Sequence, residues 1–396
     1  MEFLTGLSIR KIFPHNQNWW KFFIKHKPLI RKSIVENVCK VLACKTEAMG
    51  FHIFKCDDCG HEKKVPHTCK SRFCSSCGKK ATEQWIKINM NVLPNVPWQH
   101  ITFTLPQELR DFFWLNRDLT NRLINIPAMI ITRMAKNKGL ILGIFLAMHT
   151  FGRDLKQNSH FHLPTTSGGL SLDHSKWVSQ FFIPHQTLKN QWKYFVTKVL
   201  KQLFAEDSLK LPPVLCNIKT ITQFNAWISL LYQKTWVVHL QKVSTNHKRN
   251  IKYLGRYLKR PPISETKIKQ YDGKIVTYQF KDHHDDSIQN IDLPVDEFIA
   301  RLIRHIPDKN FRLIRYYNWL SNRLRSKLLP LVYKLINQEP ELLKKINWRE
   351  LFVQTFGKDP LKCSICNSIM SWFKNVLPTI YDMVSNHKTI ATENAF

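Results

Sequence analysis

Acidic residues are scarce in this chain of 396 residues. Asp and Glu together number 29 against 60 Lys and Arg, which gives a formal net charge of +31 at neutral pH. A folded chain with such an excess repels itself, so we expect a polyanionic partner, and nucleic acid fits best because each neutralised phosphate releases counterions. The few carboxylates form no evident acidic triad, which disfavours a recombinase that holds its metal ions with carboxylates.

Long apolar runs are also missing. The longest, residues 140–148, is shorter than a membrane-spanning helix and is interrupted by Gly143. The first residues, among them Glu2, Arg10 and Lys11, lack the basic and then apolar pattern of a secretory signal. No strongly basic amphipathic helix with aromatic anchors suggests a membrane surface. We therefore expect a cytoplasmic, nucleoid-associated protein without membrane contacts.

The rest of the composition is that of a globular protein. Hydrophobic residues make up 43% of the chain and aromatic residues 12%, and the length predicts two or three domains. Residue patterns predict helices and strands in mixed order, joined by short connections, which is typical of an α+β fold. The main predicted strands are 51–54, 100–105, 143–150, 159–163, 176–183, 236–243, 274–281 and 311–319. The main predicted helices are 19–49, 79–90, 185–204, 248–259, 293–305 and 321–337.

Ten cysteines in a cytoplasmic chain indicate metal binding more often than disulfide bonds. Cys56 and Cys59 form one C-x2-C pair, and Cys74 and Cys77 form a second about fifteen residues later. Two such pairs can surround one ion with four thiolates, the tetrahedral cage that structural Zn²⁺ prefers. Cys69, between the pairs, is a possible competing ligand. The sequence therefore predicts a zinc ribbon near the N-terminus.

The other cysteines carry weaker signals. Cys39 and Cys44 fall on the preceding predicted helix, where we interpret them as buried packing residues. Cys363 and Cys366 have the spacing of half a metal site, but no second pair follows them. We therefore favour no metal at this late pair.

A histidine pair marks the centre of the chain. His160 and His162 flank Phe161 on a predicted strand, where alternate residues face the same side. Both imidazoles then point together while Phe161 enters the core, and two imidazoles can hold one divalent cation. A third ligand is needed to complete such a site. The sequence does not choose among the candidates, which are His149, Asp154, His239 and Gln241.

Two tyrosines form the second central feature. Tyr253 and Tyr257 lie four residues apart on a predicted helix and so share one face, with Arg256 beside them. Taken alone they read as packing residues. Beside a metal site they read as nucleophiles, because a phenolate can attack phosphorus when a metal ion or an arginine assists it. Two tyrosines would allow two successive cleavages.

Several strings of this sequence resemble one known family, the rolling-circle (HUH two-tyrosine) transposases of the insertion-sequence 91 type. The strings are Cys56-Asp-Asp-Cys59-Gly-His with His67-Thr-Cys69-Lys-Ser-Arg-Phe-Cys74-Ser-Ser-Cys77, Ile101-Thr-Phe-Thr-Leu-Pro106, His149-Thr-Phe-Gly-Arg-Asp154 leading to His160-Phe-His162, Tyr253-Leu-Gly-Arg-Tyr257-Leu-Lys-Arg-Pro261, and Ile314-Arg-Tyr-Tyr-Asn-Trp-Leu-Ser-Asn-Arg323. The resemblance implies that the histidine pair binds Mg²⁺ or Mn²⁺ and that the two tyrosines cut single-stranded DNA.

The resemblance also implies an architecture. We expect an N-terminal helical and zinc-ribbon DNA-binding domain over residues 1–95, and an HUH-type antiparallel sheet flanked by helices over 96–335. A C-terminal helical segment with the late cysteine pair and a loose tail would follow over 336–396. The basic residues expected to contact nucleic acid are Lys70, Arg72, Lys259, Arg260, Arg315 and Arg323.

The expected function is transposition by nicking and rejoining single-stranded element ends through a 5′-phosphotyrosine. Two alternatives stay open at this point. The chain would be a zinc-dependent DNA-binding protein if its catalytic site has decayed, or a replication initiator or relaxase if the same chemistry acts at a replicon origin.

Overall fold

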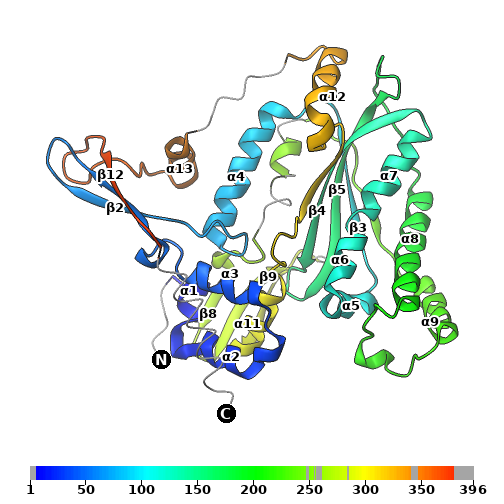
Figure 1. Cartoon of the computed structure of the whole chain (residues 1–396), viewed down its shortest axis with the longest axis horizontal. Helices are drawn as coiled ribbons and strands as arrows, with labels where there is room; N and C mark the ends of the chain where they lie inside the picture. Colours follow the sequence, from blue (N-terminus) through cyan, green and yellow to red (C-terminus); the bar gives the residue numbers. More distant parts are fainter. Residues whose placement is uncertain are drawn as a thin grey trace.

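The computed structural model describes residues 6–246, 249–253, 255, 261–282, 285–339 and 347–378. Within these residues, helices alternate with strands that form antiparallel sheets, so the predicted α+β class is confirmed (Figure 1). No helix in these segments is both long enough and apolar enough to cross a bilayer.

The largest sheet carries the predicted histidine strand near its centre. Its strand order is β11-β4-β5-β3-β7, with the short β6 paired to β5, and each neighbouring pair is antiparallel. The strands are β3 (Trp98–Thr104), β4 (Leu140–Phe151), β5 (Gln157–Ser171), β6 (Trp177–Val178), β7 (Val238–Leu240) and β11 (Ile314–Asn318). Because β5 has a paired strand on either side, side chains at its middle face a sheet surface rather than an edge.

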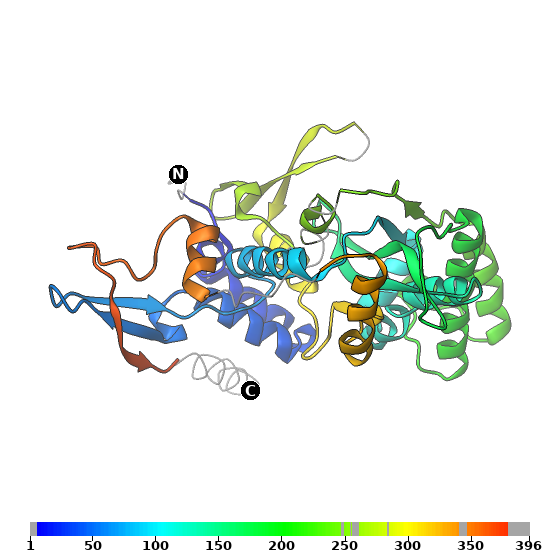
Figure 2. The same ribbon diagram turned by 90° about the horizontal axis from the view of Figure 1, so that it is seen from above.

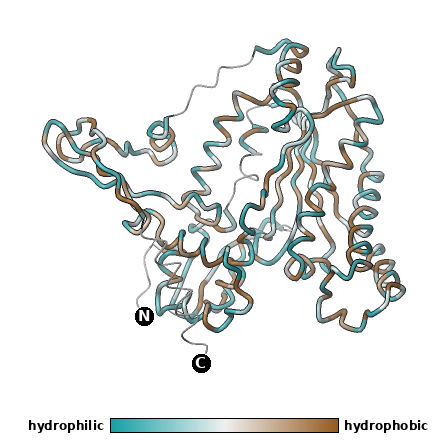
Figure 3. Tube along the Cα trace, viewed as in Figure 1, coloured by the Kyte–Doolittle hydropathy of each residue, from teal (hydrophilic) through white to brown (hydrophobic). Residues whose placement is uncertain are grey.

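One face of this sheet is apolar and is covered by helices. The covering helices are α5 (Arg110–Leu115), α6 (Arg117–Leu123), α7 (Ile126–Lys136), α8 (His185–Ala205) and α9 (Ile221–Gln233) (Figure 1). Phe103 of β3 and Phe161 of β5 are both fully buried and meet the ring of Trp192 of α8 edge-on. Along α8 apolar residues alternate with polar ones, as Figure 3 shows, so that only one side of the helix enters the core.

The opposite face is bordered by α4 (Ser75–Val92) and α12 (Asn322–Leu335), and a second core forms there. Trp85 of α4 packs against Phe145 of β4, and its indole N–H donates a hydrogen bond to the hydroxyl of Tyr316 on β11. Trp319 lies against Gly143 so closely that an added Cβ would overlap its ring. The glycine that interrupts the longest apolar run is therefore a packing requirement.

The N-terminal helices share a core with a segment from much later in the chain. Helices α1 (Ile9–Ile12), α2 (Asn18–His26) and α3 (Lys32–Leu42) pack with a sheet of order β10-β9-β8 and with α11. These later elements are β8 (Ile268–Tyr271), β9 (Ile275–Lys281), β10 (Ile288–Pro294) and α11 (Val295–Arg304). Asn18 donates a 2.6 Å hydrogen bond to the hydroxyl of Tyr271 inside this core. One hydrophobic core thus combines the N-terminal helices with elements that lie more than 200 residues later.

A narrow arm joins residues 51–66 to residues 348–376, which lie far apart in the sequence. It contains β1 (Phe51–Lys55), β2 (Glu62–Pro66) and β12 (Ser371–Val376), in the order β12-β1-β2, with α13 (Trp348–Phe356) beside it. Figure 2 shows β12 (red) beside the blue β1–β2 hairpin, although the two are far apart in the sequence.

Several elements differ from the sequence expectations. The helix predicted over 19–49 is broken, because Pro28 occupies a short 3-10 turn between α2 and α3. The strand predicted over 176–183 shrinks to β6, while α9, β8, β10 and β12 were not predicted. The predicted loose tail lies outside the described residues.

Candidate functional site

The second face of the central sheet is polar where the four strands β4, β5, β3 and β7 lie side by side. In the antiparallel register, His149 of β4 stands opposite His160 of β5, and Thr102 of β3 stands opposite His162. His239 of β7 is in turn the partner of Thr102. Residues in register share a face, so these side chains gather above the sheet while Phe161 points into the core beneath.

Three imidazoles converge at this point. His149, His160 and His162 each offer a ring nitrogen, and the three nitrogens lie within 4.8 Å of one another. His149 and His162 are buried, and His160 is half-buried. Nδ1 of His160 lies 2.8 Å from the carbonyl oxygen of Asn158, which can only accept. Donation to this oxygen places the proton of a neutral His160 on Nδ1, so Nε2 is the nitrogen that would act as a metal ligand.

A fourth histidine supports the cluster from β3. His100 Nε2 lies 3.0 Å from Nδ1 of His162, and the two rings stack with centroids 5.0 Å apart. Burial lowers the pKa of His100 to about 4 and holds the pKa of His162 well below its usual range, where the neighbouring histidines lower it further. Both rings are therefore neutral at pH 7, the state in which an imidazole binds metal.

Tyr253 reaches the same cluster from the helical residues 249–253. Its ring meets that of His100 edge-on, with centroids 5.3 Å apart. Nε2 of Gln241 donates a 2.7 Å hydrogen bond to the phenolic oxygen of Tyr253. Two residues later, an added Cβ at Gly255 would overlap Ile86 of α4, so this helix lies directly on α4. Tyr253 thus contacts His100 and lines the same cavity as the histidine pair.

These residues line one cavity of about 450 Å³. Its walls include the four clustered histidines, His239, Gln241 and Tyr253, and on the far side Lys267 and Tyr278 from the β8–β9 region. Arg153 adds a further cation, and none of the described residues that line the cavity is a carboxylate. A hollow of this size with positive walls suits one phosphate and its flanking nucleotide better than an acidic or apolar ligand.

The structure separates the candidate third ligands. His149, one of the four candidates, joins the histidine pair. Asp154 lies outside the cluster, where its carboxylate accepts from the backbone N–H of Lys156. Gln241 donates to Tyr253 and is also hydrogen-bonded to His100. The strand register that brings His149 opposite His160 could not be read from the sequence.

Four residues of the predicted tyrosine motif lie outside the described residues, namely Arg256, Tyr257, Lys259 and Arg260.

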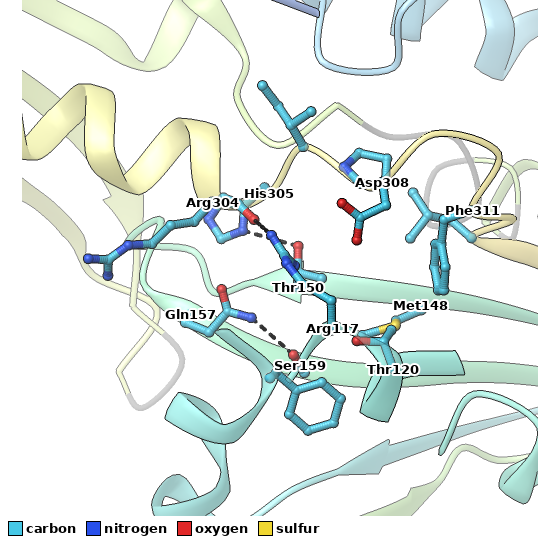
Figure 4. Close-up of a pocket in the computed structure, with 14 residues that line it drawn as sticks. Arg117, Thr120, Met148, Thr150, Gln157, Ser159, Arg304, His305, Asp308 and Phe311 are labelled. Carbon is cyan, nitrogen blue, oxygen red and sulfur yellow. Dashed lines mark hydrogen bonds between the residues drawn. The ribbon is translucent and has the colours of Figure 1, made fainter. Parts of the chain in front are cut away.

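A second hollow lies behind the site, on the opposite side of β4 and β5. Thr150 and Ser159, which alternate with His149 and His160 along their strands, point into it (Figure 4). His305 fills it by donating to the carbonyl of Leu155 and accepting from Thr150, both at 3.0 Å. The remaining space is about 20 Å³, enough for a single water. This hollow supports the strands and is too small for a substrate.

The cysteines form two clusters, not the single cage that their spacing suggested. In the first, the sulfur atoms of Cys44, Cys69, Cys74 and Cys77 all lie within 4.8 Å of one another. The measured S–S separations are 3.7 Å for Cys44 to Cys77, 3.6 Å for Cys69 to Cys77 and 3.8 Å for Cys44 to Cys74. A zinc ion about 2.3 Å from each of four thiolates requires edges of about 3.8 Å. Cys69 is thus a full member of this cluster.

The second cluster joins Cys56 and Cys59 to the late pair, Cys363 and Cys366. Cys56 therefore does not share a cage with Cys74, because β1 and β2 carry it away along the arm. Two further interpretations change with it. Cys44 is a member of the first cluster rather than a packing residue, and the late pair is not an isolated half site. Cys39 is a buried thiol outside both clusters, and burial raises its pKa to about 11.

Comparison with known proteins identifies the family. A family model described as "Putative transposase" matches residues 143–327, and one described as "Transposase zinc-binding domain" matches residues 15–105. The transposase for insertion sequence element IS801 of Pseudomonas savastanoi pv. phaseolicola is 35% identical over 371 residues, which cover 92% of this chain and 89% of the relative. The chain belongs to the insertion-sequence 91 family of transposases.

A more distant relative, "Putative transposase y4qJ" of Sinorhizobium fredii (strain NBRC 101917 / NGR234), is 26% identical over 336 residues. They cover 82% of this transposase and 84% of the relative. No solved structure matches. The first cysteine cluster falls within the stretch matched by the zinc-binding model. His149, His160 and His162 fall within the stretch matched by the transposase model. Cys363 and Cys366 lie beyond both.

The basic residues expected to contact DNA have different environments in this transposase. Lys70 and Arg323 are exposed. Arg315 is half-buried and donates to the side-chain oxygen of Asn125. The guanidinium nitrogens of Arg72 are buried, burial lowers its pKa to about 10, and its charge lies near enough to His162 to lower that pKa as well. Lys70 and Arg323 are therefore better placed for phosphate contacts than Arg72.

Proposed function

We propose that this transposase cuts and rejoins a single DNA strand through covalent bonds to tyrosine, with Tyr253 and Tyr257 each making one of two successive cuts. The observation that supports this proposal most directly is the shared cavity. Tyr253 and the three clustered histidines are brought together from three different parts of the chain, within reach of one phosphate.

The bond changes balance without an external energy source. The phenolic oxygen of Tyr253 attacks phosphorus, the phosphorus–O3′ bond breaks, and the phosphate stays on the 5′ side as a phosphotyrosine. The phenolic proton passes to solvent and the leaving O3′ takes up a proton. Because one phosphodiester replaces another, a second 3′-hydroxyl can reverse the step and rejoin the strand. The N–H of Gln241 stabilises the negative charge on the attacking oxygen.

His149, His160 and His162 would hold a divalent metal ion. The fixed tautomer of His160 and the neutral state of His162 fit this role. An ion bound there supplies Lewis-acid polarisation of the scissile phosphate. Imidazole ligands would add no negative charge to offset that of the ion, and nitrogen ligands favour Mn²⁺ over Mg²⁺, which prefers oxygen.

The first cysteine cluster would hold structural zinc and orient the helix that supports the tyrosine. Cys74 and Cys77 lie at the start of α4, and the same helix carries Trp85 and Ile86 to the base of the tyrosine segment. We infer that zinc at this cluster fixes the direction of α4 and so the position of Tyr253.

The decisive experiment uses labelled single-stranded oligonucleotides from both ends of the element, with Mn²⁺. We expect a covalent protein–DNA adduct at Tyr253 in the wild type and none at all in a Tyr253→Phe, Tyr257→Phe double variant. Tyr194→Phe, on the exposed side of α8, is the matched control and should cut normally.

Each other result is informative. Nicking that survives the double change would refute the tyrosine mechanism. A wild-type chain that binds these ends but never cuts them would indicate a non-catalytic DNA-binding protein. Cutting at a replicon origin and not at element ends would indicate an initiator or relaxase.

A further inference from the structure

The second cysteine cluster lies at the tip of the arm. Two of its four members, Cys363 and Cys366, lie more than 250 residues beyond the end of the matched zinc-binding stretch. The measured S–S separations are 3.3 Å for Cys56 to Cys366, 3.6 Å for Cys59 to Cys363 and 3.5 Å for Cys59 to Cys366. A disulfide would require about 2.05 Å. A tetrahedral zinc–thiolate cage has edges of about 3.8 Å, so these separations are much closer to those of four ligands of one ion than to those of two covalent pairs.

The two pairs present their sulfurs from turns of the same geometry. The N–H of Cys56 donates to the carbonyl of His61, and the N–H of Cys363 donates to the carbonyl of Ser368, both at 2.9 Å. In each turn the residue four positions after the first cysteine donates back to that cysteine's carbonyl.

The fourth residue after the first cysteine also has the same backbone conformation in both turns. Gly60 has φ 72° and Asn367 has φ 64°, both in the left-handed region. Glycine enters this region without strain, and asparagine tolerates it better than most residues. The late pair therefore retains the full turn of a metal-binding knuckle even though its sequence lacks the glycine.

Strand pairing brings the two knuckles to one end of the arm. β1 runs antiparallel to β12, with Lys55 opposite Ser371 at the end next to the cysteines. The first knuckle follows β1 directly, and the second precedes β12 by a few residues. The register of this pair fixes the distance between the two knuckles.

The arm has too small an apolar core to hold itself together. Its cluster of buried residues consists of Phe54, Met370 and two of the cysteines, with Val65 and Leu361 partly buried against them. Trp372 and Phe373 of β12 are more than half exposed. Modules with so little buried apolar surface usually depend on metal or disulfides, and a structural zinc supplies folding free energy directly.

We propose that Cys56, Cys59, Cys363 and Cys366 bind a second structural zinc ion, which fastens the C-terminal strand β12 to the N-terminal hairpin. The zinc-binding module of this transposase would then consist of segments from both ends of the chain. This inference does not depend on the proposed strand-cutting activity, because it concerns metal content and the order of the arm.

The test measures zinc in the purified full-length chain, under reducing conditions, by elemental mass spectrometry. We expect two zinc ions per wild-type chain and one in the Cys363→Ser, Cys366→Ser double variant. Cys216→Ser, an exposed cysteine outside both clusters, is the matched control and should keep two. Cys366→His, which preserves a zinc ligand, should also keep two.

A second measurement distinguishes the local loss of the zinc site from unfolding of the whole chain. Amide hydrogen exchange should increase over residues 371–376 in the double variant, while the strand of His160 and His162 stays protected. One zinc in the wild type, or two in the double variant, would overturn the proposal. An unchanged exchange rate in β12 after loss of one zinc would overturn the fastening role.

Discussion

The hydrogen bond from Gln241 to Tyr253 offers the sharpest test of the proposed chemistry. Its length is 2.7 Å, and the side-chain N–H points at the oxygen that would become the nucleophile. In Gln241→Leu this donor is replaced by an apolar group of similar size. The bond matters little while the phenol is neutral and much more when charge builds up on its oxygen.

The size of the effect follows from that difference. A hydrogen bond to a charged group contributes about 1.5–3 kcal/mol, which corresponds to a roughly 10- to 150-fold slower cleavage step. The assay is single-turnover cleavage of a labelled single-stranded element end, with the DNA dissociation constant measured by fluorescence anisotropy. Because the glutamine donates to the tyrosine oxygen, we expect slower cleavage with unchanged DNA affinity.

Manganese titration distinguishes this role from metal ligation. If Gln241 stabilises the tyrosine, cleavage by Gln241→Leu stays slow at every manganese concentration. If it is a metal ligand, high manganese restores the rate. Gln186→Leu, on the exposed surface of α8, should behave as the wild type. Wild-type cleavage by Gln241→Leu would refute the assigned role.

Two further predictions concern histidines on either side of the sheet. His149→Ala should weaken Mn²⁺ binding, measured by titration calorimetry, by at least about 10-fold. His174→Ala changes an exposed histidine and should leave Mn²⁺ binding unchanged. Equal Mn²⁺ affinity in the two variants would show that His149 is not a metal ligand. Burial lowers the pKa of His305 from its ordinary value of 6.5 to about 4. When the pH falls below 6.5, this histidine therefore takes up a proton in the unfolded chain but stays neutral in the folded chain. The free energy of unfolding should therefore fall by about 2 kcal/mol from this group between pH 7 and pH 5, and urea denaturation of His305→Gln should show a correspondingly smaller fall. An identical pH dependence in wild type and variant would contradict this assignment.

Local patterns in the sequence were enough to place the histidine pair. Alternation along a strand put His160 and His162 on one face and Phe161 in the core, and the structure has this arrangement. His149 could not be selected because its position depends on the pairing of β4 with β5, where the register shifts just beyond His149. Which residues face each other across two strands is decided by the whole sheet and is not written in either strand alone.

The cysteine clusters also depend on strand pairing that the local sequence does not reveal, here between segments far apart in the chain. The C-x2-C spacing correctly marked Cys56 with Cys59 and Cys74 with Cys77 as pairs, but spacing says nothing about which pairs meet. Short hairpin strands move the first pair away from the second, and a strand from the far end of the chain brings its actual neighbours. The shared core of the N-terminal helices and β8–β10 was missed for the same reason.

The pairing of Cys56 with Cys366 has a consequence for how the protein is made. The two residues are separated by 310 positions. At usual rates of protein synthesis the ribosome needs roughly 15 to 60 seconds to pass from one to the other. During that interval the β1–β2 hairpin lacks its partner strand β12 and the other two cysteines of the cluster. The strands of the histidine sheet have time to pair in the same interval. The second cysteine cluster can therefore be completed only after every described strand of the histidine sheet has been synthesised.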